Sequence, residues 1–217
     1  MKQYGDLNLR NCCCMELMSE YEDNHFDLAI CDPPYGGNDA IGLSDCKSKD
    51  KQATNRTDYK VFDNTEPTVE YWNELKRVSK HRIIWGVNFY KNSTFDGGRL
   101  CWDKHGTAFG RAELAYLSMT KSVNIVDVEW NGMIQHDMKN KEHRIHPTQK
   151  PVALYKWLLQ NYAKEGDKIL DTHLGSGSIA IACYYMGFDL VGSELDEDYY
   201  KAMMERIDKE TREQELF

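Results

Sequence analysis

The sequence lacks three features that would assign it to large classes of protein. No run among its 217 residues approaches the roughly 20 consecutive apolar residues that a membrane-spanning helix needs, so we expect no membrane partner. The first six residues contain no apolar stretch of the kind found in signal peptides, and we therefore expect a cytoplasmic protein. The seven cysteines include no CxxC pair, which favours reduced thiols over disulfides and predicts no zinc or other metal site.

The sequence is also short of positive charge, with 27 Lys and Arg against 35 Asp and Glu and a net charge of −8. The deficit is concentrated at residues 194–217, which carry nine acidic and four basic side chains. Residues 47–60 instead carry five basic and two acidic side chains, and a second basic cluster consists of Lys76, Arg77, Lys80 and Arg82. Binding of nucleic acid depends on local positive charge, so the total does not exclude it, although each cluster can equally be a solvated face.

The order of apolar and polar residues predicts strands that alternate with helices. We expect strands at residues 7–10, 26–31, 82–87, 99–102, 113–119, 168–171 and 189–192, and helices at 15–21, 67–79, 151–163, 178–186 and 196–208. This alternation predicts a doubly wound, mostly parallel α/β sheet whose ligands lie beyond the carboxyl ends of the strands. The length fits a single domain, residues 1–217.

Residues 36–66 interrupt this alternation, because they are rich in Gly, Asn, Asp, Ser, Thr and Lys and show little periodicity. A long stretch of this kind inside a compact domain is usually a mobile functional loop. We therefore expect this loop to be mobile when no partner is bound.

A glycine-rich turn, Asp171–Ser178, follows one predicted strand and opens a helix. Its glycines allow a sharp turn and a close approach to a ligand, and Glu194 ends the next strand, where an acid can hold ribose hydroxyls. Gly175 and Gly177 have the first spacing of the dinucleotide fingerprint, but Ala180 stands where its third glycine would be. By itself the turn suits S-adenosylmethionine (SAM) and a dinucleotide about equally.

The tetrapeptide Asp32-Pro33-Pro34-Tyr35 follows the apolar strand at 26–31 and points to chemistry on an amine. An exocyclic amine on an aromatic base is a poor nucleophile, because its lone pair is delocalised into the ring. The Asp32 carboxylate and the Pro33 carbonyl can accept its two N–H bonds, and the prolines fix the direction of that carbonyl. Tyr35 offers an aromatic face on which an extruded base can stack. Alone, this string could also be a turn that ends a strand.

These two strings, together with others along the chain, resemble those of the amino-methyltransferases of DNA. Their order is the β-type order, in which the catalytic loop comes before the cofactor turn. The resemblance runs over nearly the whole chain, and its most specific string is His146-Pro147-Thr148-Gln149-Lys150-Pro151. It also includes Asp32–Tyr35, Arg77–Lys80, Ile83–Gly86, Ala112–Ala115, Asp171–Ser178 and Glu194.

The resemblance implies a Rossmann-like, SAM-dependent methyltransferase fold with a seven-stranded sheet and one antiparallel strand. It implies direct transfer of the methyl group from SAM, without a metal, to a base extruded from double-stranded DNA. Adenine N6 is the implied target, because cytosine-N4 enzymes more often have Ser in the first position of the Asp-Pro-Pro-Tyr string. The catalytic residues that carry over are Asp32, Pro33, Pro34 and Tyr35. The cofactor residues are Asp32, His146, Thr148, Lys150, Asp171, His173, Gly175, Ser176, Gly177 and Glu194.

The sequence departs from the family pattern in three places. His173 stands where many members have Phe, and Cys13 stands where an acidic residue is common. Only about 26 residues separate Thr120 from His146, so the loop 36–66 and a short segment, 121–145, must share recognition of the target. The short segment suggests a short target or a homodimer, and β-type relatives often pair.

Three other functions are compatible with the sequence. The target can be cytosine N4 in DNA, or RNA, with the same fold. The chain can be a SAM-binding subunit without catalytic activity that supports a partner, although an intact Asp32–Tyr35 string argues against this. A dinucleotide-dependent oxidoreductase is the most distant alternative.

Overall fold

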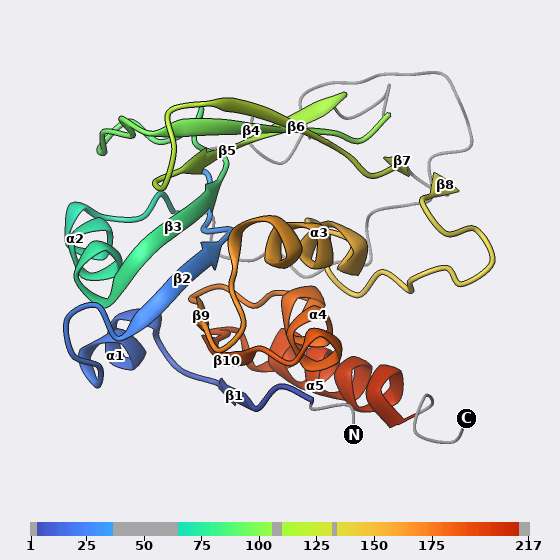
Figure 1. Cartoon of the computed structure of the whole chain (residues 1–217). Coiled ribbons are helices and arrows are strands. Elements are labelled where there is room, and N and C mark those ends of the chain that lie inside the picture. Colours follow the sequence, from blue (N-terminus) through green and yellow to red (C-terminus); the bar gives the residue numbers. More distant parts are fainter. Residues whose placement is uncertain (1–3, 37–64, 106–109, 132–133, 213–217) are drawn as a thin grey trace.

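Eight strands form one twisted sheet in the computed structural model, which describes residues 4–36, 65–105, 110–131 and 134–212 (Figure 1). Across the sheet the strands follow the order β1-β10-β9-β2-β3-β5-β4-β6. Their bounds are β1 Leu7–Arg10, β2 Phe26–Cys31, β3 Ser79–Trp85, β4 Gly98–Asp103, β5 Ala112–Leu117, β6 Val123–Asp127, β9 Lys168–Asp171 and β10 Asp189–Ser193. A separate short hairpin pairs β7 (Trp130–Asn131) with β8 (Ile134–Gln135).

All pairs in the sheet are parallel except those made by β5, which is antiparallel to both β3 and β4. The prediction of a doubly wound, mostly parallel sheet with one antiparallel strand is therefore confirmed. The described sheet has eight strands rather than seven, because β6 adds a parallel strand beside β4. This strand lies in the segment 121–145 that we expected to serve target recognition.

Helices cover both faces of the sheet. Residues of α1 (Cys14–Ser19) and α2 (Val69–Val78) belong to one buried cluster, and residues of α3 (Val152–Tyr162), α4 (Ser178–Met186) and α5 (Glu197–Arg212) belong to a second (Figure 1). The central strand β2 contributes to both, since Leu28 and Ile30 pack in the second cluster while Ala29 and Cys31 pack in the first. Such a strand is apolar on both faces, as its sequence predicts.

Side chains at the predicted helix starts act as caps. The Thr68 hydroxyl accepts the backbone N–H of Tyr71, and the Asp196 carboxylate accepts those of Asp198 and Tyr199, as expected for N-cap residues. Helix α4 begins after Gly177, which has a φ of +72°. A Cβ on Gly177 would lie 2.5 Å from Met203 of α5, so this glycine permits two helices to pack closely.

The strand order reverses between β9 and β2, which are neighbours although they lie far apart in the chain. From β9 the chain continues outward to β10, whereas from β2 it continues outward in the other direction to β3. Ligands of open α/β sheets bind at such a switch point, outside the carboxyl ends of the strands. Asp32 follows β2 and Thr172 follows β9, so the two segments with predicted chemistry meet there. None of the described helices is long and apolar enough to cross a membrane.

Candidate functional site

A cavity of about 590 Å³ opens at this switch point, within the range of roughly 300–1,000 Å³ typical of small-molecule sites. Most of the predicted site residues line it, namely Asp32, Pro33, Pro34, Tyr35, His146, Thr148, Lys150, His173, Gly175, Ser176 and Glu194. Asp171 and Gly177 are not among its lining residues. Asp171 is buried beneath the turn and Gly177 packs on α5.

The loop after β2 is held in place by aromatic residues from the segment after β3. The Tyr90 hydroxyl donates to the Pro33 carbonyl at 2.9 Å and lies 3.0 Å from the Trp85 carbonyl. The Tyr35 ring stacks on Phe89 with ring centres 4.9 Å apart, and its hydroxyl donates to Asp32 at 2.5 Å. A carbonyl and a carboxylate are thus fixed side by side at the cavity wall, as preorganised acceptors require.

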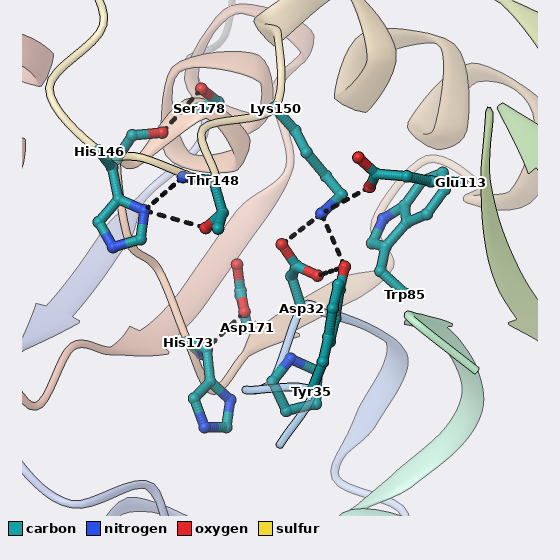
Figure 2. Close-up of polar contacts among 12 residues, drawn as sticks. Asp32, Tyr35, Trp85, Glu113, His146, Thr148, Lys150, Asp171, His173 and Ser178 are labelled. Carbon is teal, nitrogen blue, oxygen red and sulfur yellow. Dashed lines mark hydrogen bonds and ion pairs between the residues drawn. The ribbon is translucent and has the colours of Figure 1, made fainter. Parts of the chain in front are cut away.

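Asp32 forms a buried ion pair with Lys150, whose side chain is 3% exposed (Figure 2). The same ammonium lies 3.3 Å from the Tyr35 hydroxyl and 3.3 Å from the Glu113 carboxylate. Burial raises the pKa of Asp32 and outweighs the opposing effect of Lys150. We predicted Lys150 as a cofactor contact, and in the structure its ammonium is paired with the Asp32 carboxylate.

The glycine-rich turn is tied to the end of β10 through Glu194. One carboxylate oxygen of Glu194 accepts the Gly175 N–H at 2.8 Å, and the other accepts the Asp196 N–H at 2.9 Å. Gly175 has a φ of +52°, and the nearest atom to an added Cβ would be 3.8 Å away on His146, so the turn borders open space. Burial raises the pKa of Glu194. Each oxygen keeps a lone pair with which it can accept a ligand hydroxyl.

Asp171 and His173 organise the turn from below. The Asp171 side chain accepts the His173 N–H at 2.9 Å, and burial raises its pKa to about 8. The His173 ring lies 2.9 Å from the Thr172 hydroxyl, which lies 2.7 Å from the Tyr71 hydroxyl. Burial lowers the pKa of His173 to about 4, so the ring is neutral at pH 7 and can face a ligand without adding charge.

His146 and Thr148 form a further part of the wall. The Nδ1 atom of His146 lies 3.0 Å from the Thr148 hydroxyl, and the ring packs at an angle on Tyr199 with centres 4.4 Å apart. Burial, followed by the charge of Lys150, lowers the pKa of His146 to about 4. This wall therefore presents a neutral imidazole, a hydroxyl and an aromatic ring.

Arg206 of α5 supports the turn from outside the cavity, and the sequence did not point to it. Its guanidinium donates to the Ser176 carbonyl at 2.8 Å and to the Ser178 hydroxyl at 2.9 Å. It also pairs with Glu142 at 2.7 Å, and Glu142 accepts the first N–H of α3. The charge on Arg206 thereby connects the glycine-rich turn with the end of the segment 121–145.

Several residues that contact the predicted site residues were not identified from the sequence. Four residues from distant elements contact predicted site residues, namely Tyr71, Tyr90, Glu113 and Arg206. The cavity is also lined by Cys12, Cys14, Met15 and Tyr155, beside Cys13, which the sequence singles out. The local signals are the position of Tyr71 within the predicted helix 67–79 and that of Glu113 within the string Ala112–Ala115. Neither signal shows which partner the side chain reaches.

The predicted basic surfaces have different outcomes. In the cluster at residues 76–82, Arg77 pairs with Glu74 and Asp23, and Lys80 pairs with Asp27. These pairs lie near the starts of β2 and β3, at the opposite ends of these strands from the cavity. The cluster 47–60 and the expected mobile loop 36–66, from residue 37 to residue 64, lie outside the described residues.

The residues present fit the cofactor expected from the sequence. The cavity brings together carboxylates that can accept hydroxyl and ammonium hydrogens, aromatic rings, and a glycine turn without side chains in the way. A ligand that joins a ribose to a cationic, amino-acid-like end requires these groups. Among the described residues no cluster of three or more His, Cys, Asp or Glu could hold a metal ion.

Comparison with known proteins connects this geometry to a family. The family model of N6 and N4 methyltransferases, described as DNA methylase, matches residues 103–205. The Type II methyltransferase M.HpaI of Haemophilus parainfluenzae is 37% identical over 71 residues, 33% of this chain and 23% of that protein. The Type II methyltransferase M2.DpnII of Streptococcus pneumoniae is 31% identical over 81 residues, 37% of this chain and 30% of that protein. These matches thus span about a quarter of the relatives' lengths.

Longer matches come from a curated relative and from solved structures. The Escherichia coli (strain K12) protein named "Putative methylase YubD" is 27% identical over 210 residues, covering 89% of this chain and 87% of its own. The structure of an M1.HpyAVI–SAM complex covers 93% of this chain and 99% of its own at 14% identity, with a TM-score of 0.56. The cytosine-N4-specific PvuII DNA methyltransferase covers 97% and 92% at 10% identity, with a TM-score of 0.60. The family model, the relatives and the fold all support a place for this chain in the N6/N4 DNA methylase family, whose model matches its residues 103–205.

Proposed function

We propose that this protein transfers a methyl group from SAM to the exocyclic amine of a DNA base, and that the base is adenine. One observation carries the proposal: a single cavity is lined both by Asp32–Tyr35 and by the glycine-rich turn with Glu194. A methyl acceptor held by the first group and a methyl donor held by the second would share this space. Transfer between them then needs no movement of either ligand through the protein.

The acceptor half of the cavity activates the amine. The Asp32 carboxylate and the Pro33 carbonyl accept its two N–H bonds, which draws the nitrogen towards a tetrahedral, nucleophilic form. Tyr90 fixes the Pro33 carbonyl through its hydroxyl, so the acceptor does not have to reorient during the reaction. Tyr35 provides a ring against which an extruded base can pack, with Phe89 behind it.

The donor half would hold SAM, which supplies an electrophilic methyl group when bound. Glu194 would accept the ribose hydroxyls, and the turn at Gly175 and Ser176 would give the ligand room to approach the backbone. His146 and Thr148 provide polar contacts for the amino-acid end, as the family resemblance implies. The neutral His173 ring packs on the ligand where many relatives have an aromatic side chain.

Adenine N6 is proposed because Asp-Pro-Pro-Tyr is the form usual among adenine-N6 enzymes. Cytosine N4 is the second candidate, and the similarity of the fold to a cytosine-N4-specific enzyme favours it. Double-stranded DNA is the proposed partner, with the segments 36–66 and 121–145 sharing its recognition. A homodimer and a cytoplasmic location belong to the same proposal.

The proposal is tested by methyl transfer from labelled SAM to amplified, unmethylated duplex DNA. Asp32→Ala should lower the rate at least about 100-fold, the size of effect typical for loss of a preorganised catalytic group. Asp27→Ala is the matched control, because Asp27 lies in β2, the strand that Asp32 follows, but pairs with Lys80 at the opposite end of that strand. Nucleoside analysis of the product distinguishes N6-methyladenine from N4-methylcytosine.

Three results would change the conclusion. Rapid transfer by Asp32→Ala would remove Asp32 from the mechanism. N4-methylcytosine as the product would move the target to cytosine. Binding of SAM by the wild type without methylation of any nucleic acid would support the role of a non-catalytic partner subunit.

A further inference from the structure

Lys150 places one buried cation between two carboxylates from different parts of the sheet. Its ammonium pairs with Asp32, which follows β2, and lies 3.3 Å from Oε2 of Glu113, which belongs to β5 (Figure 2). The ammonium also lies 5.3 Å from the centre of the Trp85 ring. Since the Lys150 side chain is 3% exposed, water screens neither pair effectively.

Glu113 is itself held by a second cation on its other side. Its Oε1 atom lies 2.8 Å from the Lys104 ammonium, and the Lys104 side chain is 12% exposed. The backbone of Lys104 is fixed as well, since its N–H donates to Arg111 and its carbonyl accepts from Trp130. Charges therefore alternate in sign from Lys104 through Glu113 and Lys150 to Asp32.

Glu113 does not line the cavity, and it has no role in the proposed binding of the base or of SAM.

The pKa shifts of Lys150, Glu113 and Asp32 agree with an ammonium that the two carboxylates share. Burial acts against the charge on Lys150, but Asp32 and Glu113 together raise its pKa. Burial acts against the charge on Glu113, but Lys150 and Lys104 together lower its pKa. At Asp32 burial raises the pKa, Lys150 lowers it, and Glu113 raises it again. Glu113 therefore opposes the effect of Lys150 on Asp32.

We propose that Glu113 is a positioning residue of the amine-activating site, which keeps part of the Lys150 charge away from Asp32. This rests on the proposed function. A carboxylate paired with a dedicated ammonium in a buried site gives up much of its strength as an acceptor for other hydrogens. When Glu113 shares that ammonium, Asp32 remains ionised yet retains acceptor strength for the N–H of the base. Lys104 anchors Glu113 in the position that this division requires.

Few other titratable groups affect the pKa of Asp32. The titratable groups that act on it are Lys150, Glu113, Tyr35, Tyr90, Tyr155 and Asp171. The three tyrosines stay neutral below pH 10, since burial raises each pKa. Asp171 is present unchanged in all variants below. A difference between variants in the titration of Asp32 therefore reports on Lys150 and Glu113.

Two substitutions should shift the titration of Asp32 in opposite directions. Glu113→Gln removes a negative charge and leaves the Lys150 ammonium to Asp32 alone, so the pKa of Asp32 should fall by about one pH unit. Lys150→Met removes the positive charge, so that pKa should rise. The measurement is a carbon-13 NMR titration of aspartate carboxyl carbons in the free protein, with the Asp32 signal assigned from Asp32→Asn. Glu74→Gln is the matched control, since Glu74 pairs with Arg77 and is 30% exposed against 28% for Glu113.

Methyl transfer provides the second readout. Glu113→Gln should lower kcat about tenfold, move the acid limb of the kcat profile to lower pH, and leave the affinity for S-adenosylhomocysteine unchanged. Glu113→Asp should recover part of kcat, because it restores the charge. The inference is overturned if Glu113→Gln leaves the Asp32 titration unchanged, as Glu74→Gln should, or shifts it in the same direction as Lys150→Met. A wild type that transfers no methyl group while the NMR shifts appear as expected would contradict the proposed function and not the charge sharing.

Discussion

Gly86→Ala should displace the proposed catalytic loop, Asp32–Tyr35, through a single added methyl group. Gly86 follows β3 with a φ of +73°, and a Cβ there would lie 2.2 Å from Cε1 of Tyr35 and 2.5 Å from Cδ1. Contacts below 3.0 Å essentially never occur for real Cβ atoms. The Tyr35 ring must therefore move away from its present place. Since the Tyr35 hydroxyl donates to Asp32, the movement also disturbs the Asp32 carboxylate.

The cost can be worked out from its two sources. An alanine in the left-handed region costs about 1–2 kcal/mol relative to glycine. Loss of the stacked pair between Tyr35 and Phe89 adds about 0.5–1.5 kcal/mol. A protein of this size loses about 2–4 °C in Tm per kcal/mol, so Tm should fall by about 3–14 °C. Activity should fall much further, since displacing a catalytic group by about 1 Å can cost about 100-fold in rate.

Gly166→Ala separates the two effects. Gly166 has a φ of +84°, but no atom lies within 4 Å of an added Cβ, so this variant carries the backbone cost without a displaced neighbour. We expect a loss of about 1–2 kcal/mol with unchanged kcat for Gly166→Ala, and a loss of about 100-fold in kcat for Gly86→Ala. Calorimetry and labelled methyl transfer measure both quantities. If Gly86→Ala keeps the wild-type kcat, or both variants lose it equally, the close approach to Tyr35 does not orient the loop.

Two further predictions concern buried charges. Arg206→Met should lower the free energy of unfolding by about 3 kcal/mol, because Glu142 loses its buried partner. The double variant with Glu142→Gln should lose less, and urea unfolding of both compares the two values. Burial raises the pKa of Asp171 to about 8, so the folded protein holds a proton that the unfolded chain has released above about pH 4. The stability from this proton is therefore lost progressively as pH rises from about 4 to 8, and the part of the loss between pH 6.5 and 8 is about 1.5 kcal/mol; urea unfolding of Asp171→Asn should show no such loss.

The elements that frame the cavity could be predicted because their boundaries have local causes. The predicted strand 26–31 and helix 178–186 coincide with β2 and α4. Prolines end the first, and glycines stand on both sides of the second. The strand β6 could not be predicted in this way, since its alternating apolar residues Val123 and Ile125 point outward and are 72% and 70% exposed. Alternating apolar residues normally indicate the buried face of a strand, whereas in β6 they lie on the face exposed to solvent.

The contacts within the site were harder to predict than the residues that line it. The chemistry of Asp32–Tyr35 and of the turn at Gly175 is contained in short strings, because each string forms a loop at the end of one strand. The partners of these loops come from far away in the chain. Tyr90 reaches Pro33 across 57 positions, and Lys150 reaches Asp32 across 118. Such contacts depend on the order of strands in the sheet, which local patterns do not contain.

Lys150 shows why that order matters for function. A lysine in the string His146–Pro151 can serve a carboxylate of the ligand or a carboxylate of the protein, and the residue type is the same in both cases. Because β3 separates β2 from the antiparallel β5, Asp32 and Glu113 flank the lysine that enters before α3. Two carboxylates around one buried ammonium leave it little capacity for a third. We therefore expect the charge of Lys150 to act on the proposed amine-accepting half of the cavity, and binding of the cofactor to depend on Glu194, His146 and the glycine turn.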